Sequence, residues 1–89
     1  MNRLYMMELN KLMIGLMERN IAFTFTPIFG GGKVEVADGS WDAICHDGSY
    51  GHTSGLLEIM GNIVEVDYDT VEGGLTAQEI LNRVDRIGD

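Results

Sequence analysis

Between Val34 and Asn82 the chain has no lysine or arginine, although this stretch contains ten carboxylates and covers more than half of the 89 residues. The whole chain carries six basic and fourteen acidic side chains, for a formal net charge of −8 at pH 7. Direct binding to DNA or RNA is disfavoured, because there are too few cations to displace the counterions of the phosphates. A domain with one sign of charge over half its length instead attracts basic surfaces.

Cysteine and long apolar runs are also scarce. Cys45 is the single cysteine, which excludes a disulfide within the chain and any cysteine-based metal framework. A free thiol fits a reducing compartment. The apolar run 12–17 is flanked by Glu8 and Glu18, lacks a following cleavage site and is too short to span a membrane. We therefore expect a cytoplasmic protein without a signal peptide or membrane segment.

The length predicts a single domain over residues 1–89, and a hydrophobic content of 45% is enough to form a core. Residues 2–19 predict an amphipathic helix, since Leu9, Leu12 and Leu16 recur at three- and four-residue spacing, together with Met13 and Met17. Asn2 is the expected N-cap. Five methionines fall within 1–17, and such flexible side chains suit either an irregular core or an adaptable interface.

Three strands are predicted next, at 21–29, 33–37 and 41–46, joined by turns at 30–32 and 38–40. Alternation of apolar and polar residues indicates half-buried strands, and the Asp38-Gly39 pair is typical of a hairpin turn. Pro27 cannot donate a ladder hydrogen bond, so the first strand is expected at an edge. Short turns make this an antiparallel meander.

The second half predicts a short helix at 55–60 and then either a fourth strand or an extended connector at 63–68. Residues 69–75 are expected to form a loop. Thr76 and Glu79 form a capping box before a final helix that ends near Ile87 and buries that residue. The predicted fold is therefore α+β: an N-terminal helix, a three-stranded antiparallel meander, a short helix and a C-terminal helix, with the helices packed on one face of the sheet.

Cys45, His46, Asp47 and His52 are the only nucleophile-like cluster. Adjacent strand residues point to opposite faces, so Cys45 and His46 are badly placed to form a catalytic pair. Two histidines, a thiol and a carboxylate could hold zinc, but their spacing matches no recurrent zinc motif. We therefore predict no catalytic residues, no cofactor and no metal site.

The acidic stretch favours a partner-binding surface. Tyr50 lies in a polar loop, and Tyr68 is flanked by Asp67 and Asp69. Tyrosine supplies rigid contact area at interface centres, and surrounding carboxylates steer a basic partner toward them. The predicted partner-binding residues are Asp47, Tyr50, Glu65, Asp67, Tyr68, Asp69 and Glu72.

Two segments, 49–61 and 71–79, resemble small uncharacterised acidic proteins of phages and prophages of Gram-positive bacteria. The resemblance covers the C-terminal half and rests on residue pattern, so it implies no residue roles. It implies a phage context, in which some small acidic proteins block host defence, anti-CRISPR proteins among them, by occupying nucleic-acid grooves.

Together these observations predict a non-enzymatic, phage-type inhibitor in the cytoplasm of the host cell. It would present a nucleic-acid-mimicking surface to a basic nucleic-acid-binding host protein such as a CRISPR effector, as a monomer or homodimer. One alternative is a phage structural or assembly accessory that dimerises through the methionine-rich helix. Another is a small metal-assisted hydrolase that uses His46, His52 and nearby acids.

Overall fold

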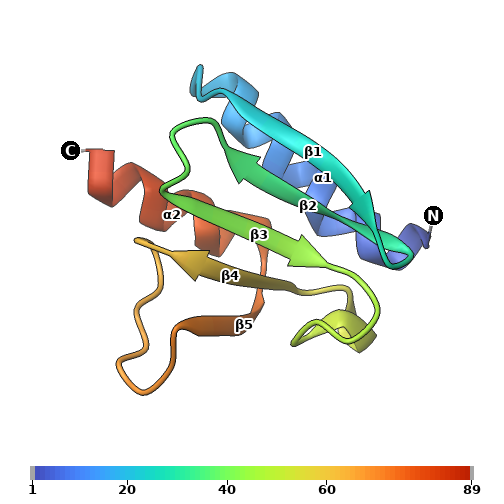
Figure 1. Ribbon diagram of the computed structural model, residues 1–89. Coiled ribbons are helices and arrows are strands. Elements are labelled where there is room, and N and C mark those ends of the chain that lie inside the picture. Colours follow the sequence, from blue (N-terminus) through green and yellow to red (C-terminus); the bar gives the residue numbers. More distant parts are fainter. Residues whose placement is uncertain (1, 89) are drawn as a thin grey trace.

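Residues 2–88 are described by a computed structural model, in which five strands form one antiparallel sheet in sequential order (Figure 1). Met1 and Asp89 lie outside the described residues. The α+β class predicted from the sequence is confirmed, but the sheet has two more strands than expected. The elements, in chain order, are α1 (Arg3–Glu18), β1 (Phe23–Ile28), β2 (Gly31–Val36), β3 (Trp41–Cys45), η1 (His52–Ser54), β4 (Leu57–Gly61), β5 (Val71–Leu75) and α2 (Ala77–Gly88).

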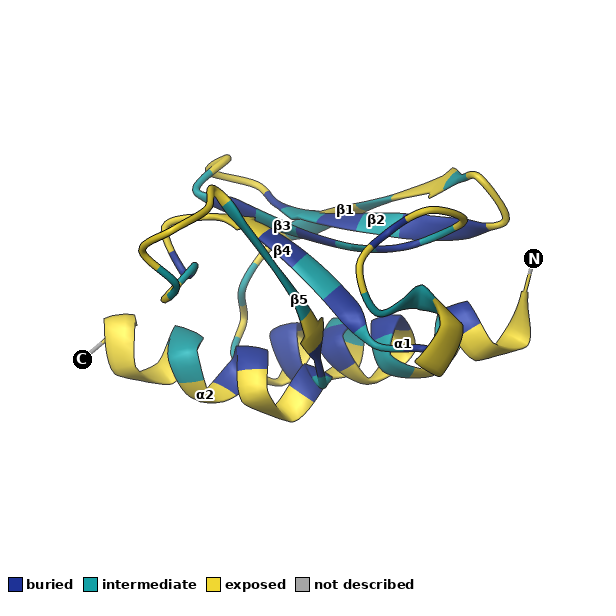
Figure 2. Ribbon diagram, turned by 90° about the horizontal axis from the view of Figure 1, so that it is seen from below, coloured by how far each residue is buried: buried dark blue, intermediate teal, exposed yellow. Residues whose placement is uncertain are grey.

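The molecule has two layers, because both helices cover the same face of the sheet (Figure 2). The core lies between these layers, and it buries alternate residues of the strands against one side of each helix. The other face of the sheet is left without a covering element among the described residues. The core residues are Tyr5, Leu9, Leu12, Leu16, Val34, Val36, Trp41, Ala43, Cys45, Leu57, Ile59, Ile63, Leu75, Ala77, Ile80 and Leu81.

Helix α1 begins as predicted, with the Asn2 side chain accepting hydrogen bonds from the backbone of Leu4 and Tyr5. Gly15 is buried against α2, where an added Cβ would overlap the Leu81 side chain. The two helices therefore approach closely at this point. Met17 was predicted on the buried side but is 58% exposed, since the sheet and α2 occupy the other sides of α1.

The first hairpin turn is tighter than predicted. Phe29 and Gly30, both with positive φ, form a two-residue turn, while Gly31 and Gly32 already belong to β2. Gly31 faces β3 so closely that an added Cβ would overlap the Cys45 carbonyl oxygen. Two of the three glycines therefore serve strand packing rather than the turn. Pro27 lies in β1, at the edge of the sheet, as the sequence indicated.

The helix predicted at 55–60 is wrong, because this segment forms β4. Leu57 and Ile59 are fully buried while Glu58 and Met60 turn the other way, which is the two-residue period of a strand. Gly55, with a φ of 69°, ends the short helix η1 instead of starting a longer one. Pairing with β3 supplies the backbone hydrogen bonds that a helix would otherwise have provided.

The loop predicted at 69–75 is also wrong, since Val71–Leu75 forms β5 and pairs with β4. A register shift between Leu57 and Ile59 accommodates the paired glycines of β5, whose lack of side chains hid the strand pattern. Residues 62–70 form the extended connector that the sequence allowed. The capping box before α2 is confirmed by mutual hydrogen bonds between Thr76 and Glu79, although Ile87 is 55% exposed rather than buried.

Candidate functional site

The uncovered face of the sheet is polar and acidic. Strand alternation and the strand register place its side chains opposite the helices. Three carboxylates and one lysine lie in its centre. We call this surface the open face, and its residues are Thr24, Thr26, Lys33, Glu35, Asp42, Ile44, Glu58, Met60 and Val71.

Two carboxylates of the open face stand directly opposite one another. Glu35 of β2 pairs with Asp42 of β3, an arrangement that brings like charges close together on one face. Burial raises the pKa of Asp42, and the charges of Glu35 and Glu58 raise it further, while Lys33 acts in the opposite direction. The centre of the open face therefore holds three carboxylates and a single lysine, and a further cation would stabilise it.

The loop 46–56 places Asp47 and Tyr50 at one border of this face. The Tyr5 hydroxyl donates to Asp47 Oδ1 at 2.8 Å, and the Tyr50 N–H donates to Glu58 Oε1 at 2.9 Å. Tyr50 packs so closely on Gly73 that a Cβ added to Gly73 would overlap the Cβ of Tyr50. Tyr50 is 59% exposed, so it lies beside the open face as an accessible aromatic residue whose position is fixed by these contacts.

The connector 62–70 carries Asp67, Tyr68 and Asp69 at the other end of the sheet, since β4 separates it from loop 46–56 (Figure 1). All three residues are exposed, and Tyr68 is 85% exposed. Asp69 Oδ1 accepts a hydrogen bond from the Thr70 N–H at 2.7 Å. The structure therefore does not bring the predicted partner-binding residues together, but divides them between two loops.

The last two predicted partner-binding residues have a structural role. The Glu72 carboxylate accepts hydrogen bonds from both terminal nitrogens of Arg83, at 2.8 and 2.7 Å. Glu65 forms ion pairs with Arg83 and Arg86. Arg83 also donates to the Ile63 carbonyl. Hydrogen bonds from Arg83 lower the pKa of Glu72 to about 2. We call Glu65, Glu72, Arg83 and Arg86 the Arg83 network, which ties the connector to α2.

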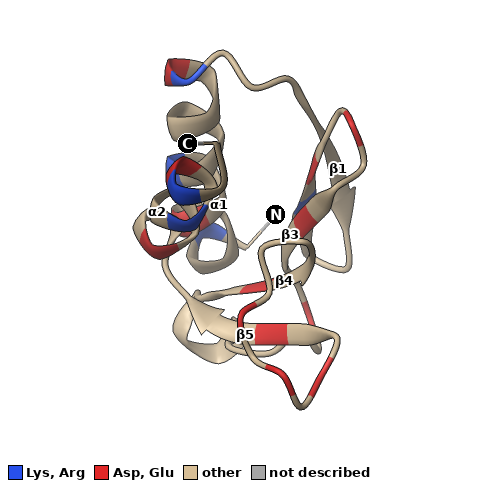
Figure 3. Cartoon of the chain, turned by 90° about the vertical axis from the view of Figure 1, so that its left-hand side faces the viewer, with Lys and Arg blue, Asp and Glu red and all other residues tan. Residues whose placement is uncertain are grey.

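Positive charge is thereby concentrated on the helix layer. Four of the six basic residues form ion pairs there: Lys11 with Glu8, Arg19 with Asp85, and Arg83 and Arg86 in their network. Figure 3 shows Lys and Arg gathered on the helices and mainly Asp and Glu along the sheet and its loops. Lys33 is the one basic residue of the sheet layer and its loops. Apart from Glu65 and Glu72, which belong to the Arg83 network, it accompanies seven carboxylates: Glu35, Asp38, Asp42, Asp47, Glu58, Asp67 and Asp69.

The cysteine and histidine cluster does not assemble into a reactive site. Cys45 is fully buried, and burial raises the pKa of its thiol, which keeps the thiol protonated and unreactive. His46 and His52 each use Nδ1 to bond a backbone carbonyl, of Asp47 and Ser49 respectively. Within residues 2–88 no three side chains of His, Cys, Asp or Glu are grouped so that they could hold a metal ion.

No family model, curated protein or solved structure matches this chain. Among the described residues, neither helix is long and apolar enough to cross a membrane.

The open-face carboxylates Glu35, Asp42 and Glu58 were missed as candidates from the sequence. For Glu35 and Asp42 the signal was present, because each is a polar position between two buried residues of a predicted strand. Glu58 was hidden by the mistaken helix at 55–60. The predicted candidates had been chosen instead for their proximity to tyrosines.

Proposed function

We propose that this chain is a non-enzymatic binding protein that presents its acidic sheet layer to a basic surface of another protein. The open face supplies the central carboxylates Glu35, Asp42 and Glu58, and Tyr50 supplies an aromatic contact at its border. The observation that supports this most is the segregation of charge. Four of the five basic residues of the helix layer are held in ion pairs, two of them with Glu65 and Glu72, while Lys33 alone accompanies the other carboxylates of the sheet and its loops.

The partner we propose is a nucleic-acid-handling protein, for example a defence effector of a bacterial host in whose cytoplasm the chain acts. Such proteins carry basic grooves that bind phosphates mainly through charge. An array of carboxylates on a rigid sheet offers a comparable charge pattern, and it associates rapidly because long-range attraction steers the encounter. The chain would then inhibit by competing with nucleic acid for the groove.

The direct test is a capture experiment from bacterial lysate with tagged protein at low and moderate salt. We expect a nucleic-acid-binding protein to be captured at low salt, lost at moderate salt and displaced by a double-stranded DNA oligonucleotide. Salt-independent capture that DNA does not displace would contradict the proposal. The comparison uses the wild type, an open-face triple variant (Glu35→Gln, Asp42→Asn, Glu58→Gln), a connector variant (Asp67→Asn, Asp69→Asn) and a helix control (Glu18→Gln).

These variants locate the contact. Loss of capture in the open-face triple variant alone places the contact on the sheet, whereas loss in the connector variant alone places it on the exposed loop around Tyr68. Loss in the Glu18→Gln control would show that net charge, rather than any one surface, determines binding. All substitutions replace a carboxylate with its amide, so they change charge with little change in shape.

A homodimer that serves phage structure or assembly is a second candidate, because α1 has an apolar stripe on its outer side. Leu4, Met7, Ile14 and Met17 are between 39% and 58% exposed. These positions are self-complementary about a two-fold axis between residues 10 and 11 of two antiparallel helices. Each residue would then face its counterpart on the second copy: Leu4 and Met17, Met7 and Ile14, and Arg3 and Glu18.

Sedimentation over a range of concentrations tests this second candidate. Dimerisation through α1 predicts a mass that rises with concentration in the wild type and stays monomeric in Ile14→Glu. Met60→Glu is the matched control, since Met60 is 48% exposed on the opposite layer. A monomeric wild type at all concentrations contradicts the dimer. The third candidate, a metal-assisted hydrolase that uses His46 and His52, has no three-ligand cluster within residues 2–88 to support it.

A further inference from the structure

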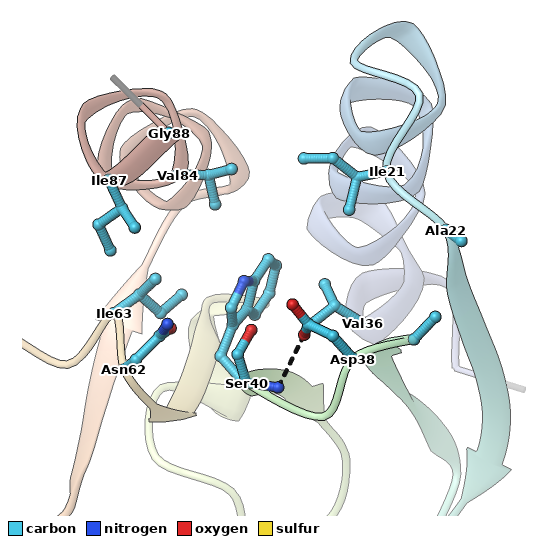
Figure 4. A pocket seen from close by; sticks show the side chains of 12 residues that line it. Ile21, Ala22, Val36, Asp38, Ser40, Asn62, Ile63, Val84, Ile87 and Gly88 are labelled. Carbon is cyan, nitrogen blue, oxygen red and sulfur yellow. Dashed lines mark hydrogen bonds between the residues drawn. The ribbon is translucent and has the colours of Figure 1, made fainter.

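An apolar pocket of about 440 Å³ opens at the end of the core, between the helix ends and the β2–β3 turn. Ile21 and Val84 face one another across it, and Ile63 and Val36 lie deeper, as Figure 4 shows. The volume falls within the range of small-molecule sites, which are mostly apolar with a few placed polar groups. The pocket lies on the helix side of the sheet and is separate from the open face.

Trp41 supplies an unused hydrogen-bond donor to this pocket. Its side chain lines the pocket and is only 6% exposed, yet the indole N–H donates to no atom of residues 2–88. No buried side-chain nitrogen or oxygen in that range lacks a partner. The indole N–H is therefore in contact with solvent. An acceptor on a bound ligand would replace water at this donor, with a modest net gain in free energy.

The charge around the pocket restricts the ligand. Its twelve lining residues include Asp38 but no lysine or arginine. Hydrogen bonds from the side chain and backbone of Ser40 lower the pKa of Asp38, so its carboxylate is ionised at neutral pH. A negatively charged ligand would therefore be repelled, while a hydroxyl or amide hydrogen would find an acceptor.

We propose that this pocket binds a small uncharged organic molecule that has an apolar body and a hydroxyl or carboxamide group. The apolar body packs between Ile21 and Val84, and the polar group accepts a hydrogen bond from the Trp41 indole. The pocket is separate from the open face. A bound ligand would lie at the end of the core, where both helices meet the β2–β3 turn.

Trp41 is the only tryptophan, so its fluorescence reports directly on the pocket. The probes are phenylbutanamide and phenylbutanoate, which share one apolar body and differ in charge. We expect phenylbutanamide to change the emission saturably with a Kd of about 2 mM, the affinity that a ligand of about twelve heavy atoms typically reaches. Phenylbutanoate should bind at least about ten-fold more weakly, because Asp38 repels its carboxylate.

A pocket variant, an open-face control and a tryptophan variant make the assignment specific. Val84→Phe places a ring opposite Ile21 within the pocket and should abolish the response, whereas Thr24→Phe places the same ring on the open face and should bind like the wild type. Trp41→Phe removes the N–H and should weaken binding by about five-fold when it is followed by ligand-observed NMR. The proposal is overturned if the folded wild type shows no saturable response, if both phenylalanine variants bind equally, or if the carboxylate binds as well as the amide.

Discussion

Carboxylates on the two faces of the sheet have opposite environments. On the face that meets the helices, Glu72 of β5 lies in the fork of Arg83 with a side-chain exposure of only 14%, and its pKa falls to about 2. On the open face, Asp42 lies opposite Glu35, and burial together with like charge raises its pKa. Ionised Glu72 therefore stabilises the fold, whereas ionised Asp42 destabilises it.

The difference separates structural charge from charge available for binding. A carboxylate already paired within the chain has to break that pair before it can contact a partner, which offsets the gain. A carboxylate held near other carboxylates, with too few cations to balance them, is stabilised when a further cation arrives. The open face is therefore better suited to binding than Glu65 or Glu72, which the sequence had grouped with the binding residues.

The largest effect is expected from breaking the Arg83 network. Arg83→Met leaves Glu72 without its partner and removes the donor to the Ile63 carbonyl. We expect the free energy of unfolding to fall by about 3 kcal/mol, because a largely buried carboxylate loses its compensating charge. Urea denaturation at pH 7 measures this change.

Arg86→Met is the matched control for that experiment. Arg86 is 62% exposed and pairs with Glu65 at the surface, so its loss should cost no more than about 0.5 kcal/mol. Equal losses of unfolding free energy in the two variants would mean that the pair of Arg83 and Glu72 stabilises the fold no more than a surface ion pair does.

Acid should weaken the connection between β5 and α2 through Glu72. Its pKa is about 2 in the folded chain against an ordinary value of 4.5, so its stabilisation is complete above pH 4.5 and is lost as the pH falls toward 2. With allowance for solvent screening, this contributes about 2 kcal/mol. Glu72→Gln should lose correspondingly less stability over the same pH range, as followed by thermal unfolding. Parallel pH profiles for the two proteins would contradict this assignment.

The open face should respond in the opposite direction. Asp42→Asn removes the charge that faces Glu35, and we expect it to stabilise the chain by about 0.5 kcal/mol at pH 7. Because the folded pKa of Asp42 is raised, the wild type regains this stability as the pH falls through that pKa, and the two proteins converge below the ordinary value of 3.8. Asp67→Asn, in the exposed connector, should leave stability unchanged. A destabilised Asp42→Asn variant would show that the charge is compensated.

Elements with strong local signals could be predicted from the sequence, and those without them could not. Two kinds of element could be predicted because their signals are local. The Asn2 cap and the capping box of Thr76 and Glu79 bond backbone N–H groups at the start of their own helices. The strands around Val34 and Ala43 show the two-residue alternation of buried and exposed side chains. Strand β5 could not be predicted, since Gly73 and Gly74 have no side chains to show a period, and it forms only through pairing with β4.

The candidate site depended even more on tertiary structure. Nothing local indicates that Glu72 meets Arg83, eleven residues away. The predicted hairpin places Glu35 and Asp42 on neighbouring strands, but their direct pairing depends on the exact register. Net charge and its distribution along the chain were readable, but which carboxylates are paired was not. For this reason the sequence indicated an acidic surface, but its predicted partner-binding residues included Glu65 and Glu72, which the fold holds in ion pairs.

The smallest effect expected is that of salt on stability, and it tests the comparison as a whole. Raising NaCl from about 0.01 M to about 1 M shortens the Debye length from about 30 Å to about 3 Å, which screens exposed charges more than partly buried pairs. If repulsion on the open face outweighs attraction on the helix layer, salt stabilises the wild type, by about 0.3 kcal/mol. The open-face triple variant should lose most of this gain. A control with the same change in net charge but no open-face substitution (Glu18→Gln, Asp67→Asn, Asp69→Asn) should keep it. Destabilisation by salt would mean that the ion pairs determine the response. The repulsion on the open face would then be weaker than the position of Asp42 opposite Glu35 implies.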